Sequence, residues 1–284
     1  MPDRQRNVGA SVRQRLLNLA HARGQSIELL LTRYALERRL HRLSLSQHRE
    51  RFVLKGAMLL ATWFDEPHRA TRDVDLLGFG DAAEDALLRA FREVVAVQAD
   101  DGVVFDLKGL RIEAIRKEGE YGGSRLRTTA SLAGARIPII VDIGFGDAVE
   151  PGVEDIDRPV LLDMPSPHLR AYPPETVIAE KFHAMVVLGR ANTRMKDYCD
   201  VWRLTSAFEI DPERLRRAIV ATFARRSTVI PVGIPDGLSD AFATDPGKQG
   251  QWEAFVQNLA GPVPDFGLVV SELRHRLAGL RPMA

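Results

Sequence analysis

Two aspartates one residue apart constrain this chain more than any other feature of its sequence. They lie in the segment Arg69-Ala-Thr-Arg-Asp73-Val-Asp75-Leu. Because side chains alternate along a strand, Asp73 and Asp75 would share one face of it. Adjacent carboxylates repel each other unless they bind a proton or a cation. At a strand end they could bind a pair of Mg²⁺ ions, the arrangement used for in-line phosphoryl or nucleotidyl transfer. We therefore expect a metal-dependent transferase.

The composition excludes several other classes of protein. The chain has 284 residues, enough for one large domain or two smaller ones, and 45% of them are hydrophobic. It has no apolar run long enough to cross a membrane and no signal-peptide core, so we expect a cytoplasmic protein without a membrane partner. The single cysteine, Cys199, excludes an internal disulfide, and no Cys/His cluster suggests structural zinc.

Positive charge is concentrated in two segments. Residues 1–55 contain twelve Lys and Arg against four acidic residues, so they carry +8 while the rest of the chain carries −7. Residues 181–226 contain ten basic and five acidic residues. This asymmetry indicates a polyanionic partner, and we expect nucleic acid. The alternative is a GC-rich genome, which favours Arg without selection for binding, since Arg outnumbers Lys 33 to 6.

The order of the predicted elements indicates an α+β fold. The first fifty residues predict two helices, the second capped by Ser26, and Asp81-Ala-Ala-Glu84 is a variant of the capping box that predicts the start of another. Residues 52–55 lead into a short predicted helix, and strand or β-like runs occupy residues 73–77, 103–107, 110–116, 125–132 and 137–143. This pattern favours a mixed or antiparallel sheet with helices on one side. Residues 150–174 predict a connection, and helices follow it.

Asp142 is a third carboxylate near the end of an otherwise apolar strand. A buried acid needs a cation or several hydrogen-bond donors, so Asp142 is a candidate metal ligand beside Asp73 and Asp75. It could also act as the base, or as the metal-linked anchor, for the attacking hydroxyl. The alternative is a turn-capping aspartate that precedes Gly144.

Basic residues could bind the nucleotide phosphates. Lys55-Gly56 precedes a predicted helix, whose free N–H groups and small glycine would allow a phosphate to approach. Lys181 falls on the inward face of a predicted helix, where a triphosphate would balance its charge; the alternative is that it extends along the helix surface to solvent. Lys196 and Asp197 lie on a second predicted helix with Asp200, and this group either binds phosphate or forms a solvated face.

Four motifs together resemble one known family. They are Leu54-Lys55-Gly56, Arg69-x-Thr71-x-Asp73-Val-Asp75-Leu, the isolated Asp142, and Glu180-Lys181 followed by Arg190 and Lys196-Asp197-x-x-Asp200. Over residues 50–205 the chain resembles the AbiEii/AbiGii-type nucleotidyltransferase toxins, which include the mycobacterial MenT toxins. The resemblance implies a DNA polymerase β-like nucleotidyltransferase core with helical additions. It also implies the toxin half of a type IV toxin–antitoxin pair, whose antitoxin is encoded nearby.

The resemblance also implies roles for individual residues. Asp73 and Asp75 would bind metal, and Asp197 would complete the site. The candidates for nucleotide binding are Lys55, Gly56, Arg69, Thr71, Lys181 and Lys196. The chain departs from the family in one place, because Ala57 stands where Gly or Ser is usual after the loop glycine.

The resulting hypothesis is a Mg²⁺-dependent enzyme that adds nucleotides to the 3′ acceptor end of tRNA and so blocks aminoacylation. The resemblance implies a preference for pyrimidines, with CTP favoured. We expect a monomer with a core domain at residues 1–165 and a helical domain at residues 166–284 that completes the active site. Two alternatives stay open: transfer to a protein or small-molecule hydroxyl, and a non-catalytic nucleotide-binding regulator.

Overall fold

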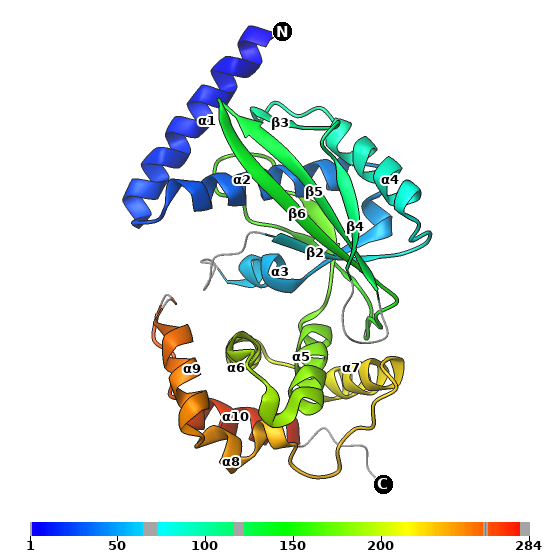
Figure 1. The fold of residues 1–284 in the computed structure, drawn as a ribbon, viewed down its shortest axis with the longest axis vertical. Coiled ribbons are helices and arrows are strands. Elements are labelled where there is room, and N and C mark those ends of the chain that lie inside the picture. The colour runs from blue at the N-terminus through cyan, green and yellow to red at the C-terminus, as the bar shows by residue number, and fades with distance from the viewer. Residues whose placement is uncertain (1, 65–72, 116–121, 258, 260, 279–284) are drawn as a thin grey trace. The chain divides into compact units, whose positions relative to one another are not determined.

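The computed structural model describes the chain except residues 1, 65–72, 116–121, 258, 260 and 279–284 (Figure 1). The candidate residues Arg69 and Thr71 lie outside the described residues. The chain forms two compact units, each described by itself below. Unit 1 contains residues up to Gly146 together with Glu154–Ala171, and unit 2 contains Asp147–Val153 together with residues from Tyr172 onward. In the described part of the chain, no helix is both long and apolar enough to cross a membrane.

Unit 1 is built on one mixed sheet with helices packed against it (Figure 1). Its helices are α1 (Pro2–Arg23), α2 (Ile27–Leu45), α3 (Gly56–Trp63) and α4 (Glu84–Ala96). Its strands are β1 (Phe52–Lys55), β2 (Asp73–Gly78), β3 (Val103–Phe105), β4 (Arg111–Ile115), β5 (Gly123–Leu132), β6 (Ala135–Phe145), β7 (Glu154–Asp157) and β8 (His168–Ala171). The strand order is β3-β5-β6-β2-β1-β8-β7, with β4 also paired to β5. The β2–β6 and β1–β8 pairs are parallel and the others antiparallel, so the prediction of a mixed sheet with flanking helices is confirmed.

Strands β7 and β8 were not predicted, because residues 150–174 indicate only a connection. Each strand has four residues, too few for an alternating pattern to stand out from the surrounding prolines. Strand β8 is half apolar and pairs with β1 through Leu54 and Ala171. Neighbouring strands supply the hydrogen bonds that make these segments extended, so the prediction of a plain connection is wrong here.

Helices α2 and α4 differ in how their first residues are capped. Ser26 caps α2, accepting a hydrogen bond from the Leu29 N–H at 3.3 Å, as predicted. Asp81 behaves differently, because its Oδ1 accepts from the N–H of Ala83 at 2.9 Å and forms a turn ahead of α4. The helix therefore begins at Glu84, and its N-cap residue Ala83 has no capping side chain.

Most arginines of α2 lie inside unit 1, so this helix does not present the positive charge from which the sequence indicated a nucleic-acid partner. Arg38, Arg39 and Arg42 are each at most 3% exposed. Arg42 donates two hydrogen bonds to the carboxylate of Asp101, at 2.6 and 3.1 Å. The guanidinium of Arg39 lies 4.9 Å from the ring centre of Phe91. These cations lie in the interior of unit 1 and cannot contact a polyanion at its surface.

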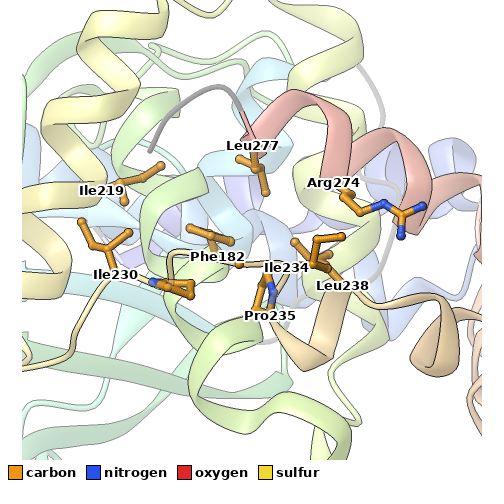
Figure 2. A pocket seen from close by; sticks show the side chains of 10 residues that line it. Phe182, Ile219, Ile230, Ile234, Pro235, Leu238, Arg274 and Leu277 are labelled. Carbon is orange, nitrogen blue, oxygen red and sulfur yellow. The ribbon is translucent and has the colours of Figure 1, made fainter. Parts of the chain in front are cut away.

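Unit 2 is helical, as the sequence predicts for the region after Pro174. Its helices are α5 (Pro174–Leu188), α6 (Met195–Ala207), α7 (Pro212–Arg225), α8 (Asp240–Ala243), α9 (Pro246–Val256) and α10 (Phe266–Ala278). Tyr198 packs against Phe242 and Phe266, with ring centres 5.6 and 5.4 Å apart. Figure 2 shows an apolar pocket in this unit, lined by side chains that include Phe182, Ile219 and Leu277. Its lining has too few polar groups to bind a triphosphate.

Candidate functional site

A row of charged side chains crosses four neighbouring strands of unit 1. Lys55 pairs with Asp75, Asp75 pairs with Asp142, and Asp142 pairs with Arg125. Side chains at directly paired positions point to the same face of a sheet. The row therefore reads positive, negative, negative, positive, and Asp73 lies on the same face two residues before Asp75. The sheet brings together the three carboxylates that were candidates from the sequence.

Gly56 allows the carboxylate of Asp75 to lie against the start of α3. A Cβ atom at position 56 would lie 2.0 Å from Oδ2 of Asp75, far inside van der Waals contact. Gly56 also has a φ of +70°, a conformation that favours glycine. The sequence predicted that this glycine would allow a phosphate to approach, whereas in the described structure the group next to it is a carboxylate. The position of Asp75 near a helix N-terminus is favourable for its negative charge.

Arg125 holds both oxygens of Asp142. Its Nε and Nη2 atoms donate to Oδ1 and Oδ2 of Asp142, each at 2.7 Å. The hydrogen bond to Asp142 raises the pKa of Arg125, and the charge of Asp142 adds to this effect. Two parallel charge-assisted bonds are the strongest arrangement for such a pair.

The sequence interpretation missed Arg125, although a local signal was present. Ala133 and Gly134 both have positive φ and form the two-residue turn between β5 and β6. A two-residue turn sets the register of the whole hairpin, so counting outward from Leu132 and Ala135 places Arg125 opposite Asp142.

The carboxylates suit a hard divalent cation. Mg²⁺ is usually bound by one or two carboxylates together with waters and substrate phosphates, and Asp73 and Asp75 supply such oxygens. Asp142 lies beside them but is bound to Arg125. Among the described residues no group of three or more His, Cys, Asp or Glu side chains is arranged to hold a metal ion. The donor set therefore fits one ion on Asp73 and Asp75, with Asp142 adjacent.

Lys181 lies in unit 2, where two carboxylates bind its ammonium group. Nζ of Lys181 donates to Oδ1 of Asp197 at 2.6 Å and to Oδ2 of Asp200 at 2.9 Å. Burial alone would lower the pKa of Lys181, but the charges of Asp200 and Asp197 outweigh it and raise the pKa. The charge that balances this lysine in the structure thus belongs to α6. The side chain is 15% exposed, so it does not extend freely into solvent.

The residues expected on one side of α6 separate into two groups. Asp197 and Asp200 are buried against Lys181, whereas Lys196 and the preceding Arg194 are exposed. Cys199 is buried, as predicted for a core residue. On this helix the two aspartates therefore lie inward and Lys196 faces solvent.

A second ion-pair cluster in unit 2 joins Arg226, which follows α7, to side chains of α5. Arg226 pairs with Glu180 at 3.2 Å and with Asp147 at 3.4 Å, and its Nη1 lies 3.3 Å from Nδ1 of His183. Nε2 of His183 lies 2.9 Å from the hydroxyl of Thr228. Burial, followed by the charge of Arg226, lowers the pKa of His183 to about 4. His183 is therefore neutral at pH 7.

Three comparisons with known proteins show what this chain is similar to. The family model "Nucleotidyl transferase AbiEii toxin, Type IV TA system" matches residues 38–277. Two solved structures from Helicobacter pylori are similar to this chain. JHP933 has 14% identity and a TM-score of 0.43, and the match covers 90% of this chain and 98% of JHP933. A putative nucleotidyltransferase has 12% identity and a TM-score of 0.40, and the match covers 91% of this chain and 100% of the other. The comparison with curated proteins gives no match. Because the family model matches most of the length of this chain, the chain belongs to the AbiEii family of nucleotidyltransferase toxins of type IV toxin–antitoxin systems.

Proposed function

We propose that this toxin is a Mg²⁺-dependent enzyme that adds pyrimidine nucleotides, from CTP or UTP, to the 3′ acceptor end of tRNA and so blocks aminoacylation. The observation that carries the proposal is the pairing of Asp75 with Asp142 beside Asp73 on one face of the sheet. We further propose that unit 1 is a DNA polymerase β-like core, that the toxin acts as a monomer, and that its antitoxin is encoded nearby.

The acidic residues have distinct roles in this proposal. Bound Mg²⁺ would neutralise the phosphate charge and favour ionisation of the attacking hydroxyl. Asp73 and Asp75 hold the ion, and Asp142 is the third ligand or accepts the hydroxyl proton. Lys55 lies opposite Asp75 and is the cation of unit 1 that we assign to the nucleotide, together with Gly56, Arg69 and Thr71.

Lys181 is assigned to a phosphate oxygen, with Asp197 completing the site. A lysine has three N–H donors, and the bonds to Asp197 and Asp200 use two of them. The third donor is the one that we assign to phosphate, and the two aspartates would keep the ammonium in place. Lys196 is exposed and is assigned to the same substrate.

Exposed positive charge supports tRNA as the acceptor, although fewer basic residues are exposed than the sequence indicated. The buried arginines of α2 make no contribution. In unit 2 the residues Arg190, Arg194, Lys196, Arg217 and Arg225 are exposed. Exposed cations of this kind attract the phosphates of RNA without reading its sequence.

The test is to incubate the purified protein with Mg²⁺, total tRNA and one labelled NTP at a time. We expect label at the tRNA 3′ end, most from CTP or UTP, and none after chelation of the metal. Asp73→Asn should reduce incorporation at least ~100-fold, because a metal ligand contributes several kcal/mol to the transition state. Asp157→Asn, an exposed carboxylate on the edge strand β7, is the matched control and should retain activity.

Other outcomes would redirect the proposal. Label in a protein or a small molecule, with none in tRNA, would show that the acceptor is wrong. Tight NTP binding without incorporation into any acceptor would identify a non-catalytic regulator. Equal incorporation by the wild type and Asp73→Asn would remove the metal site from the reaction.

A further inference from the structure

Asp142 already has a cation as its partner. Both of its oxygens accept hydrogen bonds from Arg125, and the two side chains are 20% and 35% exposed. A divalent ion bound near Asp73 and Asp75 would attract the same carboxylate. Arg125 and the ion would then compete for the oxygens of Asp142.

Arg125 has a second acidic residue on its other side. Strand β5 lies between β6 and β4, and Arg125 is paired in register with Asp142 on β6 and with Glu113 on β4. The Glu113 side chain is 57% exposed and already accepts a hydrogen bond from Nε of Arg127 at 3.2 Å. The charge of Glu113 also raises the pKa of Arg125, after the larger effect of Asp142. A guanidinium released by Asp142 would therefore stay beside a carboxylate.

We propose that Arg125 is a positioning residue that competes with the divalent cation for Asp142. Without metal, Arg125 holds the Asp142 carboxylate and offsets the repulsion among the three aspartates. When an ion binds, Asp142 exchanges Arg125 for it, and Arg125 turns towards Glu113. The exchange weakens metal binding to the free protein. The inference rests on the proposed function only for the presence of a divalent ion on these aspartates.

A purely structural ion pair predicts a different result. If Arg125 only stabilised the sheet, its removal would lower the free energy of unfolding and leave metal affinity unchanged or weaker. Competition predicts the opposite sign, because Asp142 becomes available to the ion. Loss of a nearby positive charge alone also favours cation binding, so the sign of the change in metal affinity separates the two explanations together with its dependence on Asp142.

The experiment measures Mn²⁺ binding to the full chain by electron paramagnetic resonance, without nucleotide or tRNA. For Arg125→Gln we expect Mn²⁺ to bind about 10-fold more tightly, the effect of one unit charge a few Å away at a partly exposed site. Arg127→Gln is the matched control, since it removes the same charge two residues away, and it should change the affinity much less. Arg125→Lys keeps the charge without the two-pronged bond and should give an intermediate affinity.

A double variant tests whether Arg125 acts through Asp142. Arg125→Gln/Asp142→Asn should bind Mn²⁺ no more tightly than Asp142→Asn alone. The proposal is overturned if folded Arg125→Gln binds Mn²⁺ as wild type does or more weakly, or if the double variant keeps the full gain. If Arg125→Gln does not fold, Arg125→Lys decides by the same criterion. The Mn²⁺ binding experiment contains no acceptor, so its result does not depend on nucleotide transfer. Tighter Mn²⁺ binding by Arg125→Gln, together with no labelling of tRNA in the transfer assay, would support the exchange and contradict only the proposed function.

Discussion

Gly56 shows how a single residue positions a candidate metal ligand. Replacement by alanine would force the new Cβ against Oδ2 of Asp75, at 2.0 Å, so the carboxylate must move. We expect Gly56→Ala to reduce nucleotide incorporation about 100-fold, the usual effect of a misplacement of about 1 Å. Gly80→Ala is the matched control, because Gly80 has a similar positive φ of 80° but nothing within 4 Å of its Cβ position. Equal losses in both variants would show that backbone strain, not Asp75, is the cause.

Lys181 is the cation on which two buried aspartates of unit 2 depend. Lys181→Met would leave Asp197 and Asp200 without it, and we expect the free energy of unfolding to fall by about 3–5 kcal/mol. Lys248→Met, which removes a hydrogen bond to the Asn192 carbonyl and a cation–π contact with the Phe242 ring, should cost only about 1–2 kcal/mol. Chemical denaturation measures both. An unchanged stability of Lys181→Met with lost activity would limit Lys181 to a substrate contact.

His183 should make stability depend on pH. Its pKa is lowered to about 4 in the folded protein, by burial and then by Arg226, against about 6.5 in an unfolded chain. Between these values the unfolded chain binds more protons, so the free energy of unfolding is full above pH 6.5 and falls as the pH drops towards 4. The loss should be on the order of 1–2 kcal/mol after allowance for partial solvent screening. His183→Gln should flatten this part of the profile, measured by urea denaturation, and an unchanged profile would assign it to other groups.

At the scale of elements, the start of α4 lacks a capping side chain. Ala83 has the extended backbone of an N-cap residue, with ψ of 141°, but no side-chain acceptor. Ala83→Asp should therefore raise the free energy of unfolding by about 1 kcal/mol. Ala82→Asp adds the same charge one residue earlier and should have little effect. An equal gain in both variants would mean that charge at the helix end, rather than the cap, is responsible.

The β5–β6 hairpin shows how far an element can be predicted. Both strands were predicted as β-like runs, at residues 125–132 and 137–143. The short turn then determines which residues face each other, so the partner of Asp142 follows from the sequence by counting. The pairing of β2 with β6 does not follow in this way. These strands are parallel and far apart in the chain, so other contacts must bring them together.

At the scale of the molecule, two basic segments can be compared as RNA-binding surfaces. Exposed residues of unit 2 are Arg190, Arg194 and Lys196, and exposed residues of α1 are Arg13, Arg15 and Arg23. We expect the unit 2 triple Gln variant to weaken tRNA binding and to reduce the slope of log affinity against log salt by about 2, as three lost phosphate contacts would. The α1 triple Gln variant is the control and should change the slope less. Fluorescence anisotropy over a range of salt concentrations measures both, and the reverse order would place the RNA on α1.

Some features of the molecule were determined by the sequence alone. Period-two alternation places Asp73 and Asp75 on one face, and Ser26 starts α2 whatever surrounds it. These outcomes depend on the geometry of a few consecutive residues. The tertiary structure decided the rest: that the arginines of α2 are buried, and that Asp197 and Asp200 balance Lys181 where a triphosphate was expected. A charged residue can be identified from the local sequence, but its partner comes from the element that packs against it. Which element packs there depends on contacts between distant parts of the chain.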